Sequence, residues 1–217
     1  MRLSAASIAT LLVVVSFPPS PADAQSSRSY PSVDLSVGPG FLTSGAYFTG
    51  PGDLALDNSD ALAGVLQVIV PVNRSFSLVA GGAYARPEWH LAGVPLLGSI
   101  GVDGASLWFA DAGVRGQVPL GSQQGTGPTA FAQLGAGLAH YSLSTSVLSQ
   151  AVDESATNFA LALGAGIGVP LAERFGLELM AKDYIVSFES VRDLESLGVE
   201  GQRAHTLVLS LSARVSI

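Results

Sequence analysis

Hydrophobic and polar residues alternate at every second position over much of the chain, a pattern that predicts β-strands with one apolar and one polar face. The last segment shows it most clearly, because Leu207, Leu209 and Leu211 alternate with polar residues such as Ser210 and Ser212. Segments of this kind cover residues 32–48, 62–71, 76–85, 108–118, 130–142, 159–169, 175–182 and 206–217. The pattern therefore predicts an all-β chain with eight strands.

The spacing of three prolines predicts how these strands are connected. The dipeptides Val70-Pro71, Val118-Pro119 and Val169-Pro170 each close a strand, and their prolines are 48 and 51 residues apart. Proline at a strand end removes an N–H group where the hydrogen-bonded ladder stops. Each interval holds two strands and a longer connection, at about 86–105 and 143–157, and further long connections are expected at about 49–61 and 187–204. Short turns that alternate with long connections are typical of an up-and-down antiparallel barrel.

The composition indicates where such a sheet resides. Of the residues, 48% are hydrophobic and 12% are charged, and the mean hydropathy is +0.43, whereas about 25% of a soluble domain is charged. A membrane-spanning helix needs about 20 consecutive apolar residues, but the longest apolar stretch, 8–17, is interrupted by Thr10 and Ser16. The other structure that satisfies every backbone group in a bilayer is a closed barrel. We therefore expect an eight-stranded antiparallel up-and-down transmembrane β-barrel rather than a soluble β-sandwich or lipocalin-like barrel.

The N-terminal residues have the features of a secretory signal peptide. Arg2 precedes the apolar stretch 8–17, and Ala22-Asp23-Ala24 stands before Gln25 like a cleavage site. The expected division is a signal peptide at 1–24 and an outer-membrane barrel domain at 25–217. The chain has no cysteine, which excludes disulfides and Cys-ligated metal sites.

Aromatic and acidic residues are placed as a membrane barrel requires. Two aromatic girdles are expected at the membrane interfaces, and they include Tyr47, Tyr84, Trp89, Trp108, Tyr141, Phe159, Phe175, Tyr184 and Phe188. The long connections hold Asp53, Asp57, Asp60, Glu88, Asp103, Asp153, Glu154, Glu189, Asp193, Glu195 and Glu200 against Arg86, Arg192 and Arg203. The net charge of −7 argues against a nucleic-acid partner.

The polar face of the strands predicts a network of polar side chains inside the barrel. Its expected members are Asp34, Gln67, Asp111, Arg115, Gln117, Gln133, Glu178, Lys182 and Arg214. Arg214 can lie between Asp34 and Glu178, while Lys182 and Asp111 lie deeper and can pair across the lumen. The interior of an eight-stranded barrel is just wide enough for side chains to fill. Such a network either seals the lumen or, as the alternative, forms a narrow gate.

Taken together, the signal peptide, eight alternating strands, short turns and acidic connections resemble the small OmpA/OmpX-like outer-membrane β-barrels. The resemblance spans the chain after residue 24, and the run from Arg174 through Glu178 to Lys182-Asp183-Tyr184 is similar to a seventh strand common in such domains. Members of that family usually end in an aromatic residue, whereas this chain ends in Ile217. The resemblance implies a bacterial outer-membrane location, assembly by the barrel assembly machinery, contact with outer-membrane lipid and lipopolysaccharide, and a monomeric state.

One pair of residues suggests a reaction. His140 and Ser142 share a strand face, so the imidazole can act as a general base toward the hydroxyl, and Glu154 can orient the histidine. The spacing is similar to the His-x-Ser of outer-membrane lipid A deacylases, although Leu143 stands where that family has Asn. A lipid A-modifying esterase is therefore an alternative function, set against the simpler interpretation of polar residues near lipid headgroups.

The function that the sequence favours is non-enzymatic. We expect an integral outer-membrane barrel that displays acidic extracellular loops around a polar, plugged or narrowly gated lumen, with a small-solute channel as the alternative. No cofactor is expected. No metal site is expected either, because His90, His140 and His205 lie on separate strands or loops.

Overall fold

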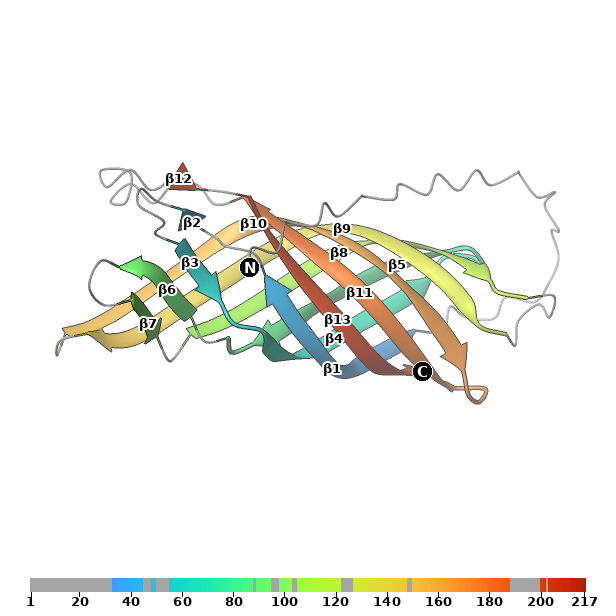
Figure 1. The fold of residues 1–217 in the computed structure, drawn as a ribbon. Coiled ribbons are helices and arrows are strands. Elements are labelled where there is room, and N and C mark those ends of the chain that lie inside the picture. The colour runs from blue at the N-terminus through green and yellow to red at the C-terminus, as the bar shows by residue number, and fades with distance from the viewer. Residues whose placement is uncertain are drawn as a thin grey trace, which may run out of the picture. The chain divides into compact units, whose positions relative to one another are not determined.

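The structure is a computed structural model that describes residues 33–44, 48–49, 55–87, 89–94, 98–102, 105–121, 127–147, 150–187, 200–201 and 203–217. Within these ranges, eight strands form a closed antiparallel barrel (Figure 1). They are β1 (Asp34–Ser44), β4 (Ala61–Pro71), β5 (Phe76–Ala85), β8 (Ala105–Pro119), β9 (Thr129–Val147), β10 (Gln150–Pro170), β11 (Phe175–Ser187) and β13 (Arg203–Ser216). The order β1-β13-β11-β10-β9-β8-β5-β4 closes because β1 pairs with both β13 and β4. The expected eight-stranded antiparallel barrel is confirmed.

The two ends of the barrel differ in their connections. Turns at 72–75 and 171–174 lie at one end, together with the start of β1 and the end of β13, and we call this the short-turn end. In the first turn, the backbone N–H groups of Ser75 and Phe76 donate to Asn73 Oδ1 at 2.8 and 2.9 Å. Pro71, Pro119 and Pro170 are the last residues of their strands, as their spacing predicts. The opposite end is the long-connection end.

The long connections contain more strand than the alternation predicts. A second sheet, in the order β12-β2-β3-β6-β7, is formed by β2 (Phe48–Thr49), β3 (Ala55–Asn58), β6 (Trp89–Val94), β7 (Gly98–Val102) and β12 (Glu200–Gly201). The predicted connection 143–157 is wrong, because β9 and β10 stay paired up to Val147 and Gln150. This part of the hairpin is rich in Ser and Thr, and without an apolar face it gives no alternating signal, although its backbone still pairs.

The outer face of the barrel is apolar, as the alternation predicts. Exposed fractions of 43–54% are found for Val37, Phe41, Leu66, Leu78, Val114, Leu134, Leu161, Leu163, Ile167, Leu179, Leu209 and Leu211. Asp183 departs from the pattern, because it lies on this outer face and its Oδ2 is 2.8 Å from Nδ1 of His205. Among the described residues, no helix is long and apolar enough to cross a membrane. The predicted signal peptide, 1–24, lies outside the described residues.

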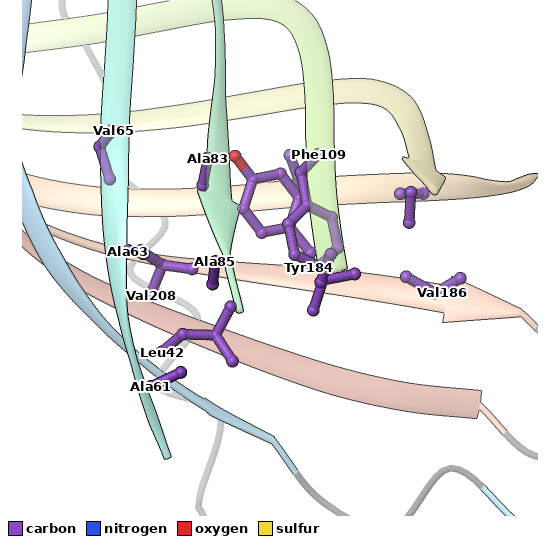
Figure 2. Packing of buried hydrophobic residues seen from close by; sticks show 14 of the residues in the cluster. Leu42, Ala61, Ala63, Val65, Ala83, Ala85, Phe109, Tyr184, Val186 and Val208 are labelled. Carbon is purple, nitrogen blue, oxygen red and sulfur yellow. The ribbon is translucent and has the colours of Figure 1, made fainter. Parts of the chain in front are cut away.

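The inner face changes character along the barrel. Toward the long-connection end it is apolar and rich in alanine (Figure 2), with Leu42, Ala61, Ala63, Val65, Ala83, Ala85, Leu107, Phe109, Ala139, Tyr141, Ala160, Ala162, Tyr184, Val186, Ala204 and Val208 buried there. The rings of Phe109 and Tyr184 stack within this group, with centroids 4.1 Å apart. The lumen is therefore polar only in part, since the predicted network of polar side chains gives way to apolar side chains toward the long-connection end.

Close contact between β8 and β9 generates a prediction about strand packing. A Cβ atom on Gly137 would overlap the carbonyl oxygen of Ala110 on the neighbouring strand, whereas one on Gly64 would have no atom within 4 Å. We expect Gly137→Val to lower the free energy of unfolding by about 1–3 kcal/mol, and Gly64→Val to change it by less than about 0.5 kcal/mol. Urea unfolding in detergent micelles, followed by tryptophan fluorescence, measures both. Equal losses in the two variants would contradict the close contact.

Candidate functional site: the charge network of the lumen

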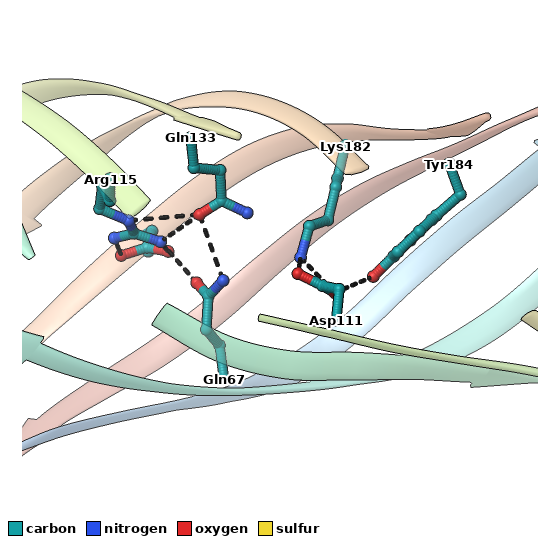
Figure 3. Close-up of polar contacts among 7 residues, drawn as sticks. Gln67, Asp111, Arg115, Gln133, Lys182 and Tyr184 are labelled. Atoms are coloured by element: carbon teal, nitrogen blue, oxygen red, sulfur yellow. Dashed lines mark hydrogen bonds and ion pairs between the residues drawn. The ribbon is translucent and has the colours of Figure 1, made fainter. Parts of the chain in front are cut away.

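The largest cluster in the lumen surrounds a buried arginine. Arg115 of β8 is 0% exposed, and its Nη1 and Nη2 donate to the two carboxylate oxygens of Glu178 on β11 at 2.8 and 2.9 Å (Figure 3). This is a bidentate ion pair, the strongest arrangement that a guanidinium makes with a carboxylate. Because β8 and β11 are not neighbours in the sheet, the pair crosses the lumen.

Two glutamines complete the coordination of this guanidinium. Gln133 Oε1 accepts from Nη2 and Nε of Arg115 at 3.1 and 3.3 Å, and Gln67 Oε1 accepts a further bond from Nη2. Gln67 Nε2 in turn donates to Gln133 Oε1 at 3.2 Å. The ring of Phe131 lies 3.9 Å from the guanidinium carbon, close enough for a cation–π contact. Side chains from β4, β9 and β11 therefore meet at Arg115 of β8 inside the barrel.

A second cluster lies nearer the long-connection end. Lys182 Nζ on β11 donates to both oxygens of Asp111 on β8, at 2.7 and 2.8 Å, and Tyr184 Oη donates to Asp111 Oδ2 at 3.0 Å. Lys182 and Asp111 are the residues expected to pair across the lumen, and the structure joins them. Their exposed fractions of 3% and 7% place this ion pair in the barrel interior, where an unpaired charge would be costly.

The remaining charged residues of the network lie at the short-turn end. Ser216 Oγ donates to Asp34 Oδ1 at 2.6 Å, and Arg214 Nε is 3.8 Å from Asp34 Oδ2. The sequence suggests that Arg214 lies between Asp34 and Glu178, but in the structure Arg214 pairs with Asp34 while the carboxylate of Glu178 is bound by Arg115. The six charged residues thus form three ion pairs at three levels of the lumen.

The assignments of Gln117 and Tyr184 made from the sequence need correction. Gln117 is not in the network, because its Nε2 donates to the backbone oxygen of Arg74 at the short-turn end. Tyr184 is not in the aromatic girdle, because it points inward to Asp111 and is 1% exposed. Its position two residues after Lys182, on the same strand face, is the signal that could have placed it in the lumen. Phe131, which precedes Gln133 by two residues, could have been found in the same way.

The outward aromatic residues are fewer than predicted. Tyr84, Trp108, Phe159 and Phe175 lie on the outer face with exposed fractions of 36–59%. Tyr141 is buried on the inner face, so its assignment to the girdle is wrong. The side chains of Tyr47, Trp89 and Phe188 lie outside the described residues.

The candidate catalytic residues have separate partners. His140 lies toward the outer face, where its Nδ1 is 2.7 Å from Thr157 Oγ1 and its ring stacks on Trp108. Ser142 Oγ is 2.8 Å from Ser106 Oγ. Glu154 lies on β10 opposite Leu143, and its side chain lies outside the described residues. The contacts of His140 and Ser142 therefore connect them to the neighbouring strands rather than to each other.

No group of three or more His, Cys, Asp or Glu side chains in the described part of the chain is arranged to hold a metal ion. The interactions that the structure shows in the lumen are hydrogen bonds and three ion pairs, in which the cations and anions neutralise one another.

The bidentate pair generates a prediction about stability. We expect Glu178→Gln to lower the free energy of unfolding by about 3–5 kcal/mol, because it leaves the buried charge of Arg115 without a counter-ion. Replacing both residues by Met removes the unpaired charge, so the double variant should regain most of that loss. Urea unfolding in detergent micelles provides the comparison. Asp34→Asn is the control, with an expected loss below about 1 kcal/mol because its ion pair is partly exposed. A Glu178→Gln loss no larger than that of the control contradicts the prediction.

Solved structures of outer-membrane proteins share this fold. The outer membrane protein OprG from Pseudomonas aeruginosa aligns with a TM-score of 0.60 and 9% sequence identity, over 86% of this chain and 96% of that chain. Neisserial surface protein A aligns with a TM-score of 0.52 and 9% identity, over 85% of this chain and 97% of that chain. No family model and no curated protein matches the sequence. The chain has the fold of the small eight-stranded outer-membrane β-barrels, as the sequence resemblance implies.

Proposed function

We propose that this protein is an integral β-barrel of the bacterial outer membrane, exported by residues 1–24, with a sealed lumen and no catalytic role. The apolar outer face supports the membrane location. Leucines such as Leu66, Leu134 and Leu211 are about half exposed on it, and a soluble monomer rarely presents a continuous apolar surface of this kind. The core of a bilayer is as apolar as these side chains. A barrel embedded in a bilayer therefore keeps them out of water.

The observation that carries the sealed lumen is the coordination of Arg115. The guanidinium is fully buried, and its bonds extend to β4, β9 and β11. A solute that crosses this level has to displace a bidentate ion pair and two glutamine contacts. Breaking a buried ion pair is costly, so the resting barrel should neither conduct ions nor pass water-soluble molecules.

The connections at the long-connection end complete the proposal. Eleven acidic residues against three arginines lie within residues 49–61, 86–105 and 187–204 together with 143–157, the part of the β9–β10 hairpin nearest this end. In an outer-membrane barrel the longer connections face the cell exterior and the short turns face the periplasm. The protein would thus display an acidic surface outside the cell, as a monomer held by outer-membrane lipid and lipopolysaccharide after insertion by the barrel assembly machinery.

A combined electrophoresis and conductance experiment tests the proposal. The protein, produced from the full sequence and extracted from the outer-membrane fraction, is expected to run at different positions unheated and boiled, because a closed barrel resists detergent until it is heated. In a planar bilayer the wild type should give no current steps. The Arg115→Ala and Glu178→Ala double variant should give them, because it opens the lumen without leaving an unpaired charge.

Each outcome decides one part of the proposal. A band that does not shift on heating contradicts the membrane barrel. A band that shifts, with current steps from the wild type, contradicts the sealed lumen. The Asp34→Asn variant is the matched control, because it alters a charge at the short-turn end while leaving Arg115 in place.

A small-solute channel is the second candidate, and one observation favours it. Gln133 Nε2 is buried without a hydrogen-bond partner, although such groups are normally satisfied. This amide provides a free hydrogen-bond donor for a polar solute at the level of Arg115. If the wild type conducts, Lys182→Gln should change the size of the current steps.

A further inference from the structure

We propose that the outer face of β5, β8, β9 and β10 near the long-connection end binds the headgroup of a phosphorylated glycolipid of the surrounding membrane. The inference rests on the proposed membrane location and adds a specific lipid site to it. The residues that carry it are Arg86, Tyr84, Trp108, His140 and Thr157. None of them belongs to the charge network of the lumen.

These residues form a continuous row across four strands. Strand pairing places Tyr84 opposite Trp108, Trp108 opposite His140, and His140 opposite Thr157. The row is held by contacts, since the rings of Trp108 and His140 stack with centroids 5.2 Å apart, and Nδ1 of His140 is 2.7 Å from Thr157 Oγ1. Arg86 Nε donates to Tyr84 Oη at 2.8 Å and extends the row at its β5 end.

A second row of polar groups runs one step nearer the long-connection end. Ser106 and Ser142 face each other with their hydroxyl oxygens 2.8 Å apart, and Ser155 lies opposite Ser142 on β10 and is exposed. Arg86, one residue beyond the end of β5, lies two residues after Tyr84 and so belongs to this second row. The two rows together present a guanidinium, an imidazole and several hydroxyl groups on one face.

The rows lie where the outer face stops being apolar. One step toward the short-turn end, Ala110 is paired with Leu138 and Leu138 with Phe159, and all three are exposed. Tyr84 and Trp108 follow, with exposed fractions of 44% and 36%, and the hydroxyl row comes next. Toward the long-connection end, the outer face thus changes from apolar side chains to amphipathic aromatic rings and then to polar groups. A lipid leaflet has the same order of tail, interface and headgroup.

The size and chemistry of the surface favour a glycolipid. Four paired strands span about 14 Å at the usual strand spacing of about 4.8 Å, which exceeds the width of a single phosphate and suits a phosphorylated disaccharide. Arg86 provides a donor for phosphate. A groove beside it is lined by Asp60, Leu62, Gly64 and Tyr84, and the carboxylate of Asp60 can accept from a sugar hydroxyl. A headgroup that has both phosphate and hydroxyl groups can pair with the donor of Arg86 and with the acceptor of Asp60 at the same time.

The experiment measures lipid binding by the full-length product purified from outer membranes. The folded protein in detergent is titrated with lipid A or with phosphatidylglycerol, and bound lipid is counted by native mass spectrometry. We expect lipid A to bind at least tenfold more tightly than phosphatidylglycerol. The Arg86→Gln and His140→Gln double variant should lose about tenfold in lipid A affinity, equivalent to 1.4 kcal/mol. Arg174→Gln, an exposed arginine at the short-turn end, should lose nothing.

Three results would overturn the inference. Equal affinity for the two lipids shows general attraction of anions, unchanged binding by the double variant places the lipid elsewhere, and an equal loss in Arg174→Gln shows that position on the barrel is irrelevant. Heat-dependent migration is recorded on every sample. A folded, shifting band without lipid A binding contradicts only the lipid site, whereas a band that does not shift contradicts the membrane barrel itself.

Discussion

Backbone N–H and C=O groups find no hydrogen-bond partner in the core of a bilayer, so a sheet that lies there has to close on itself. In this molecule β1 closes the ring by pairing with β4 on one side and β13 on the other. A ring of eight strands leaves an interior that side chains can just fill. Charged residues on the inner face therefore have to satisfy one another, and the three ion pairs of the lumen are the result.

The alternation of apolar residues was sufficient to predict the barrel strands, because every second side chain lies on the apolar outer face. The same alternation fails in the Ser- and Thr-rich part of the β9–β10 hairpin, and for that reason β9 and β10 extend beyond the predicted segments. The alternation alone could have assigned Tyr184 and Tyr141 to the inner face of the barrel, because inward side chains recur at every second position. The sequence does not show that Glu178 pairs with Arg115 rather than with Arg214, because the partners across the lumen depend on the stagger of all eight strands.

The polar groups of the lumen and those of the outer wall lie at different levels of the barrel. Inside, polarity is concentrated around Arg115 and Lys182, and it gives way to an alanine-rich lining toward the long-connection end. Outside, the middle of the wall is apolar, and polar groups such as Arg86 and His140 gather toward that same end. The proposed seal and the proposed lipid site therefore lie on opposite faces of the barrel wall and at different levels, so that a change in one need not disturb the other.

The hydrogen bond between Asp34 and Ser216 joins residues 182 positions apart. The strands that it connects, β1 and β13, are the first and the last of the barrel. A chain that emerges from a ribosome or a translocation pore end first cannot form this seam until β13 has appeared, and until then β1 and β4 lack the rest of their ring. The ring therefore closes last, and the apolar outer faces of the earlier strands stay without their full set of neighbours until the whole chain is present.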